Sequence, residues 1–146
     1  MSDLDGVPGY AHPDFAAHFT DPLYTHPADD FAPFGSAEGA DLWVEAEERR
    51  GELGAQATVA DVLELTGTDD AEEFVDEIGE GSPDLDGFVI GAGFALLRLT
   101  GQIDDRGRRW LQDALDRTHR FYGEGFADEH ALMTGDLATF GSVARG

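Results

Sequence analysis

The chain has 146 residues, of which 41% are hydrophobic, so it is long and apolar enough for one domain with its own core. Its formal net charge is −22, from 31 acidic residues against nine arginines, because lysine is absent. Nucleic acid and anionic membranes attract basic patches, so this charge argues against direct nucleic-acid binding and against membrane-surface binding. The absence of cysteine excludes disulfides and thiolate metal sites.

The first residues and the apolar runs both bear on location. Residues 1–9 lack the basic start and the apolar stretch of a secretory signal. The longest uncharged apolar run, residues 87–97, is too short to cross a bilayer. We therefore expect a cytoplasmic protein.

Residues 1–35 differ from the rest because they hold five of the six prolines and three of the five histidines. Proline disrupts a helix interior, so we expect an irregular arm. A short echo within it pairs His12-Pro13 with His26-Pro27, each followed by Asp and Phe. The arm is expected to pack its aromatic side chains onto a helical body. The alternative is a linear motif that docks on a partner.

From Ser36 onward the apolar spacing and the capping residues predict helices. The first follows Ser36 and ends near Gly51, and the second starts at Thr58, with Asp61 completing a capping box. Further helices are expected to begin at Thr68, at Ser82-Pro83 and at Asp104 or Asp105. A weaker helix is expected over residues 128–140, interrupted at Gly135.

Residues 88–99 form the least polar stretch and allow two structures. A buried central helix is our first choice, although Gly91 and Gly93 would each cost about 1 kcal/mol of helix propensity unless another helix packs closely there. The second is a pair of buried strands turning at residues 91–93.

These patterns predict an all-α fold, with five or six helices over residues 36–146 forming a small bundle behind the arm. The alternative is an α+β fold with a short hairpin near residues 88–99. The expected core consists of large apolar residues from each helix: Trp43, Val62, Phe74, Ile78, Val89, Phe94, Leu97, Trp110, Leu111, Leu115 and Phe121.

The acidic residues are concentrated in one segment. Residues 69–86 contain nine acids and no basic residue. We expect an acidic partner-binding face here, composed of Asp69, Asp70, Glu72, Glu73, Asp76 and Glu77. A basic protein would be its partner, and an immunity protein or a nucleic-acid mimic would be two versions of this function. The competing hypothesis is a solvated surface, acidic only because of a high-GC genome or a salt-rich cytoplasm.

Arginine is concentrated later, with six arginines within residues 98–120. Guanidinium groups match phosphates and carboxylates, so Arg106, Arg108 and Arg109 form a weak candidate anion site. The competing hypothesis is that these arginines pair with the protein's own acids. In particular, Arg109, Asp113 and Arg117 are spaced as i,i+4 neighbours.

No motif assigns an enzymatic function. The histidines lack metal-ligand spacing, and no serine lies in a nucleophile elbow. We therefore assign no catalytic residue, no metal and no cofactor, and we favour a non-enzymatic protein. The alternative function is a small-ligand or metal-binding protein that uses the histidine-rich arm and the arginine-rich helix.

Overall fold

A computed structural model describes residues 10–26, 29, 31–54, 56–78 and 82–145 of the chain. These residues form helices and connecting turns, with no strand among them. The α-helices are α1 (Pro13–His18), α2 (Ala37–Glu48), α3 (Val59–Leu65), α4 (Ala71–Asp76), α5 (Pro83–Thr100), α6 (Asp105–Tyr122) and α7 (Ala127–Arg145). Short 3-10 helices are η2 (Pro22–Thr25), η3 (Arg50–Glu52) and η4 (Gly123–Phe126).

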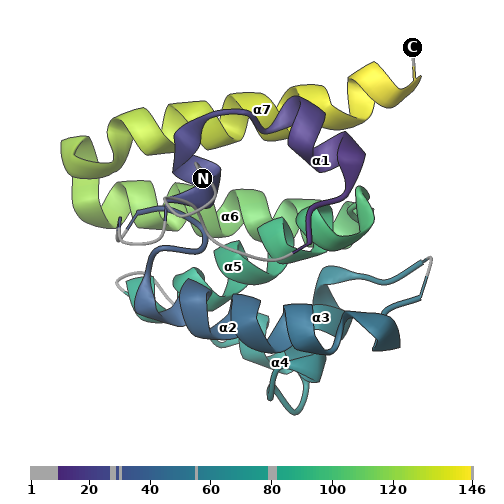
Figure 1. The fold of residues 1–146 in the computed structure, drawn as a ribbon. Helices are drawn as coiled ribbons and strands as arrows, with labels where there is room; N and C mark the ends of the chain where they lie inside the picture. The colour runs from purple at the N-terminus through teal and green to yellow at the C-terminus, as the bar shows by residue number, and fades with distance from the viewer. Residues whose placement is uncertain (1–9, 27–28, 30, 55, 79–81, 146) are drawn as a thin grey trace.

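The fold is built in layers around α5, as Figure 1 shows. Helices α2, α3 and α4 lie on one side of α5, and α6 lies on the other. Helix α7 covers α6, and α1 lies against α7. The prediction of an all-α bundle is confirmed, since six α-helices, α2 to α7, follow Ser36 in the described part of the chain. None of the described helices combines the length and the apolar character needed to cross a bilayer.

Helix α5 is enclosed on all sides, because every residue from Val89 to Leu99 is buried. The central helix predicted here is therefore confirmed, and the alternative hairpin near residues 88–99 is wrong. A helix that is apolar all round needs neighbours all round. Helices α2, α3 and α6 supply them.

The two central glycines allow the neighbouring helices to approach α5 closely. A Cβ atom on Gly91 would lie 3.1 Å from the Cα atom of Gly39 in α2. One on Gly93 would lie 2.8 Å from Cδ2 of Leu111 in α6. We expected a helix here only if another helix packed closely against these glycines. That close packing is present, and it offsets the low helix propensity of glycine.

Side-chain caps fix where several helices begin. Asp104 accepts hydrogen bonds from Gly107 N–H and from Val59 N–H, both at 2.9 Å, so it caps α6 and also ties the start of α3 to it. The capping box predicted for Thr58 and Asp61 is present. Two predicted boundaries are wrong: Asp70, rather than Thr68, caps α4, and α7 continues through Gly135 because its helical hydrogen bonds do not need that side chain.

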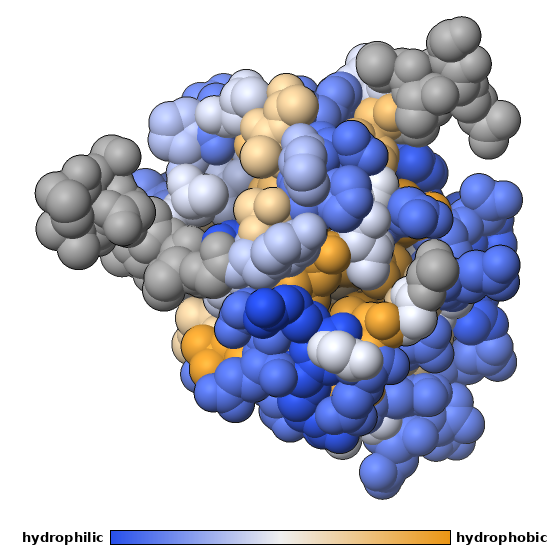
Figure 2. All heavy atoms as spheres, turned by 45° about the vertical axis from the view of Figure 1, so that its right-hand side comes forward, coloured by the Kyte–Doolittle hydropathy of each residue, from blue (hydrophilic) through white to orange (hydrophobic). Residues whose placement is uncertain are grey.

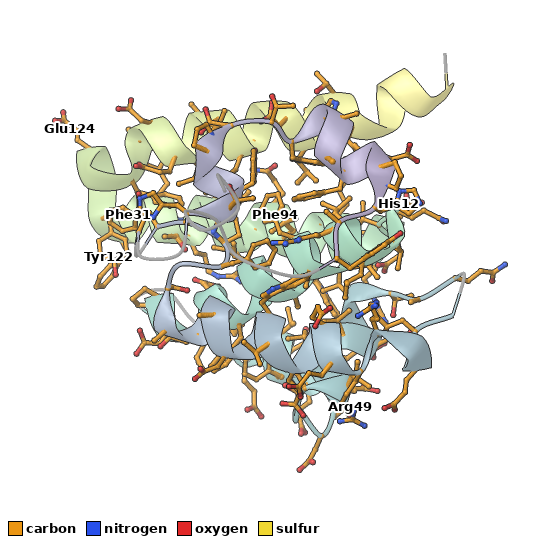
Figure 3. The ribbon with its side chains drawn as sticks, in the orientation of Figure 1. His12, Phe31, Arg49, Phe94, Tyr122 and Glu124 are labelled. Atoms are coloured by element: carbon orange, nitrogen blue, oxygen red, sulfur yellow. The ribbon has the colours of Figure 1, made fainter. Side chains whose placement is uncertain are left out.

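The arm packs aromatic side chains into the core, as we expected, but it is not irregular throughout. It contains α1 and η2, because Pro13 and Pro22 stand at helix starts, where proline is tolerated. Its aromatic side chains Phe15, Phe19 and Tyr24 are buried, and the rings of Phe19 and Tyr24 contact Phe94, which Figure 3 places at the centre of the molecule. These aromatic residues are therefore used inside the fold and are not displayed to a partner.

Most of the predicted core is buried, with three exceptions. Phe74 and Trp110 are only partly buried. Phe121 is 52% exposed, so its prediction is wrong: it lies beyond Thr118, the last buried position of α6. The core also contains residues that we did not predict, above all Phe126, Met133 and Leu137.

A glycine-to-alanine pair tests the close packing of α2. The methyl group in Gly39→Ala would overlap the carbonyl oxygen of Pro33, so we expect a loss of about 1–3 kcal/mol in the free energy of unfolding. The matched control is Gly135→Ala in α7, where a Cβ atom meets nothing. We expect that change to stabilise the protein by up to about 1 kcal/mol through helix propensity. Urea unfolding of both variants measures this, and equal effects would contradict the packing.

An alkaline titration tests how the arm is held. Tyr24 donates a hydrogen bond to Asp136 Oδ2 at 2.8 Å, and burial, followed by this hydrogen bond, raises the pKa of Tyr24 far above its ordinary value of 10.0. The folded protein therefore keeps a proton that the unfolded chain releases, so stability falls as pH rises above 10.

We expect the absorbance of tyrosinate at 295 nm to rise in two steps. The later step should coincide with unfolding and disappear in Tyr24→Phe, while Tyr10→Phe, at an exposed tyrosine, should keep it. A late step that persists in Tyr24→Phe would contradict the buried hydrogen bond.

Candidate functional site

The acidic face predicted from sequence consists of Asp69, Asp70, Glu72, Glu73, Asp76 and Glu77. All six residues are exposed, on α4 and on the residues that flank it on either side. Asp70 caps the helix by accepting a hydrogen bond from Glu73 N–H at 3.1 Å. Glu72 forms an ion pair with Arg106 of α6. The remaining carboxylates are in no ion pair with a described residue, so the face keeps most of its negative charge.

An apolar hollow lies beside the acidic face, between α2, α3, α4 and α5. This cavity of about 240 Å³ is lined by apolar side chains of all four helices: Leu42, Leu63, Phe74 and Phe88. Asp41 and Glu45 of α2 stand at its rim. We call it the α4 pocket. Carboxylates of α2 therefore border the depression, and α4, which carries part of the acidic face, contributes Phe74 to its lining.

Negative charge is present elsewhere as well. Exposed carboxylates of the arm, α6, η4 and α7 include Asp14, Asp21, Asp105, Asp113, Glu124 and Asp128. The face in Figure 2 is largely hydrophilic, with apolar surface near its middle. The acidic face differs from the rest of the described surface by its density, with six exposed carboxylates within residues 69–77.

The three arginines of the weak anion site have separate surroundings. Arg106 pairs with Glu72, and its guanidinium group lies 4.7 Å from the ring centroid of Trp110. Arg108 donates a hydrogen bond to the carbonyl oxygen of Leu137 at 2.5 Å, and Arg109 is exposed. Arg106 therefore serves as an internal counter-charge to the acidic face.

Two further charged groups are internal, which the sequence did not reveal. Asp86 accepts hydrogen bonds from Arg117 Nε and Nη2 at 3.0 and 2.8 Å, and its side chain is 2% exposed. The i,i+4 pairing proposed for Arg117 with Asp113 is therefore replaced by this tertiary pair. Arg98 is buried as well, with its guanidinium carbon 4.1 Å from the Trp43 ring centroid. Burial lowers the pKa of Arg98 to about 10, and the negative charge of Glu47 partly offsets this lowering.

The histidines have structural contacts. His12 and His26 repeat one arrangement, in which Nδ1 accepts a hydrogen bond at 3.1 Å, from Asp14 N–H and from Asp29 N–H respectively. His12 caps the start of α1 in this way, whereas His26 stands at the end of η2. His119 stacks on His130 with ring centroids 4.4 Å apart. No set of three or more His, Asp or Glu side chains among the described residues is arranged to hold a metal ion.

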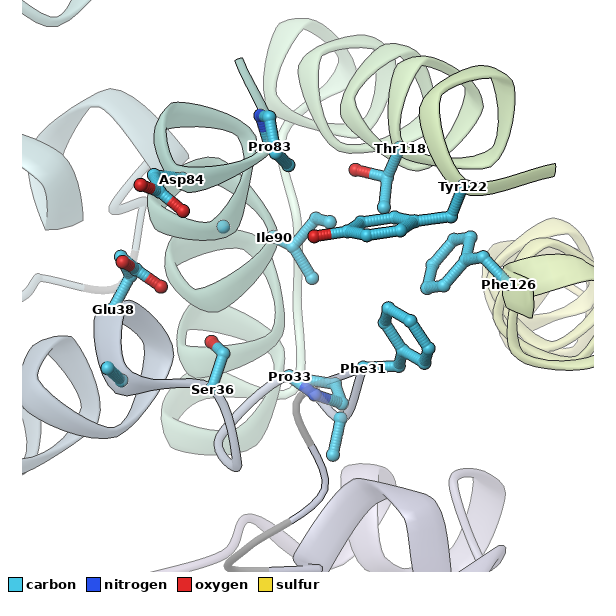
Figure 4. Close-up of a pocket in the computed structure, with 13 residues that line it drawn as sticks. Phe31, Pro33, Ser36, Glu38, Pro83, Asp84, Ile90, Thr118, Tyr122 and Phe126 are labelled. Atoms are coloured by element: carbon cyan, nitrogen blue, oxygen red, sulfur yellow. The ribbon is translucent and has the colours of Figure 1, made fainter. Parts of the chain in front are cut away.

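A second cavity, of about 230 Å³, lies where the starts of α2 and α5 meet the end of α6. Figure 4 shows Tyr122 reaching from α6 toward Ile90 of α5, with Phe31 and Phe126 beside it. Glu38 and Asp84 line the opposite side. We call it the aromatic pocket. It combines three aromatic rings with two carboxylates.

Comparison with known proteins assigns no activity. No family model matches the chain, and no solved structure matches it. One curated protein, the uncharacterized protein YfeS of Escherichia coli K12, is 61% identical to this chain over 31 residues. The match covers 21% of this chain and 13% of YfeS, so the chain corresponds to a small part of that relative's length.

Proposed function

We propose that this protein is a non-enzymatic interaction protein that binds a basic protein partner through the acidic face. The observation that supports this most directly is the exposure of all six carboxylates within residues 69–77. Only Glu72 of the six is paired with a described cation. Such a dense field attracts a basic surface over a distance and raises the association rate at low salt.

The α4 pocket supports the same proposal. Charge at the rim of an interface gives rate and specificity, whereas an apolar side chain that fills a pocket supplies most of the affinity. The pocket offers the apolar side chains of Leu42, Leu63 and Phe74 to such an anchor, with Asp41 and Glu45 of α2 beside them. The expected partner is therefore a basic segment that carries an apolar anchor residue.

Two versions of this function share the same chemistry. An immunity protein would neutralise a basic toxin, and a nucleic-acid mimic would occupy a site that normally binds phosphates. We propose the cytoplasm as the compartment, with which a cysteine-free chain is compatible. The competing account is an acidic coat that serves only solubility at high salt, and exposed carboxylates on α6 and α7, such as Asp105 and Asp128, fit that account too.

Two matched quadruple variants separate the accounts. The face variant combines Asp69→Asn, Glu73→Gln, Asp76→Asn and Glu77→Gln, and it spares the cap Asp70 and the paired Glu72. The control variant combines Asp105→Asn, Asp113→Asn, Glu124→Gln and Asp128→Asn, which removes the same charge from exposed positions. The probe is a lysine-rich amphipathic peptide with one central leucine, titrated by calorimetry at low and high salt.

We expect the face variant to weaken peptide binding about tenfold at low salt, because four exposed charge contacts of a few tenths of a kcal/mol each are lost. The control variant should change affinity less than about twofold, and replacing the central leucine by serine should weaken binding to the wild-type protein. Equal losses in both quadruples would contradict the proposal. Free energy of unfolding that rises steeply with KCl, together with such equal losses, would establish the solubility account.

A further inference from the structure

We propose that the aromatic pocket is a binding site for a small organic ammonium cation, a group that carries methyl or methylene carbons on a positively charged nitrogen. This site is separate from the acidic face and does not depend on the function proposed for it. Both pockets contact α2 and α5, but none of the residues that line the aromatic pocket lines the α4 pocket.

The rings of the pocket hold one another in place. Phe31 meets Tyr122 edge-on, with ring centroids 4.9 Å apart, and meets Phe126 in the same way at 5.3 Å. Figure 3 shows Phe31 and Tyr122 together at one end of the molecule. Aromatic faces attract cations through their negative quadrupole, and rings fixed beforehand lose little freedom when a ligand binds.

The charges of the pocket favour a cation. Glu38 lies in the first turn of α2 and Asp84 in the first turn of α5, and neither forms an ion pair with a described residue. Each helix start contributes a positive charge of only about half a unit, which is less than the full negative charge of its carboxylate. The first N–H groups of a helix have no partner inside the helix. In α2, one of them, that of Gly39, donates a hydrogen bond to Ser36 Oγ at 3.0 Å.

The nearby positive charge is already balanced. Arg117 is directed to Asp86, and its side chain is 15% exposed, so it is no partner for an incoming anion. The pocket therefore combines an excess of negative charge with apolar ring surface.

The mixed lining selects among cations. A hard ion such as Ca²⁺ takes six to eight oxygen ligands, whereas this pocket is lined on one side by Phe31, Tyr122 and Phe126. A methylated or alkylated ammonium group matches both halves, because its carbon atoms contact the rings and its charge faces the carboxylates. A cavity of about 230 Å³ suits a ligand of a few heavy atoms.

The test compares choline with 3,3-dimethyl-1-butanol, its uncharged isostere, by NMR titration of the full chain at constant ionic strength. We expect choline to bind with a dissociation constant of about 1 mM or tighter. Its chemical shift changes should centre on residues around Tyr122 and Asp84, and the uncharged isostere should bind at least about tenfold more weakly. A second titration uses Nα-acetyl-lysine methylamide, which carries the ammonium group of a lysine side chain. It distinguishes a lysine side chain of a protein from a free organic cation as the source of the bound group.

Variants locate the site. Tyr122→Leu, and separately Glu38→Gln with Asp84→Asn, should each weaken choline binding at least about fivefold. Tyr10→Leu, and Asp105→Asn with Asp113→Asn, are the matched controls at exposed positions and should leave it unchanged. Equal binding of choline and its isostere, no saturable binding of either cation, or shifts of the same residues by inorganic phosphate would overturn the proposal.

Discussion

The enclosure of α5 is the constraint on which the rest of the structure depends. A helix whose residues are buried from Val89 to Leu99 is stable only if every side of it is covered. Gly91 and Gly93 bring α2 and α6 close, and Arg117 of α6 neutralises Asp86, the carboxylate that α5 carries inside. The positions of the other helices follow from how each one covers this axis.

The arm is part of the same enclosure. Phe19 and Tyr24 pack on Phe94 of α5, and Tyr24 donates a hydrogen bond to Asp136 of α7. Residues near the start of the chain therefore connect α5 and α7, which both lie far from the arm in sequence. Arg98 adds a second connection, because its Nε donates to the carbonyl oxygen of Tyr10 at 2.9 Å. With the core filled in this way, the dense run of carboxylates within residues 69–77 remains exposed to solvent.

The sequence predicted those features that depend on residues close together in the chain, such as where helices begin. Thr58 with Asp61, and Asp104, each cap a helix start in the structure, because caps depend on residues a few positions apart. Helix α5 starts at the predicted place because Pro83 favours the first helical position, although Ser82 makes no capping hydrogen bond. The exposure of the acidic face was predictable for the same reason, since carboxylates in a short polar helix remain in water.

Long-range partners could not be read in the same way. Asp86 stands in a run of acids and resembles a solvated residue, but Arg117, 31 positions away, draws it into the interior. Arg98 similarly depends on Trp43 and Tyr10, which no spacing rule connects to it. The aromatic pocket brings together Phe31, Glu38, Asp84 and Tyr122 from four separate segments, so only the fold reveals it.

Native-state hydrogen exchange tests the enclosure of α5 most directly. Amides between Val89 and Leu97 should exchange most slowly of all, at a rate set by global unfolding, because no local opening can expose a helix covered on every side. Amides of α4, which packs through one face only, should exchange faster. Exchange in α5 that is as fast as in α4, or that is insensitive to denaturant, would contradict the account.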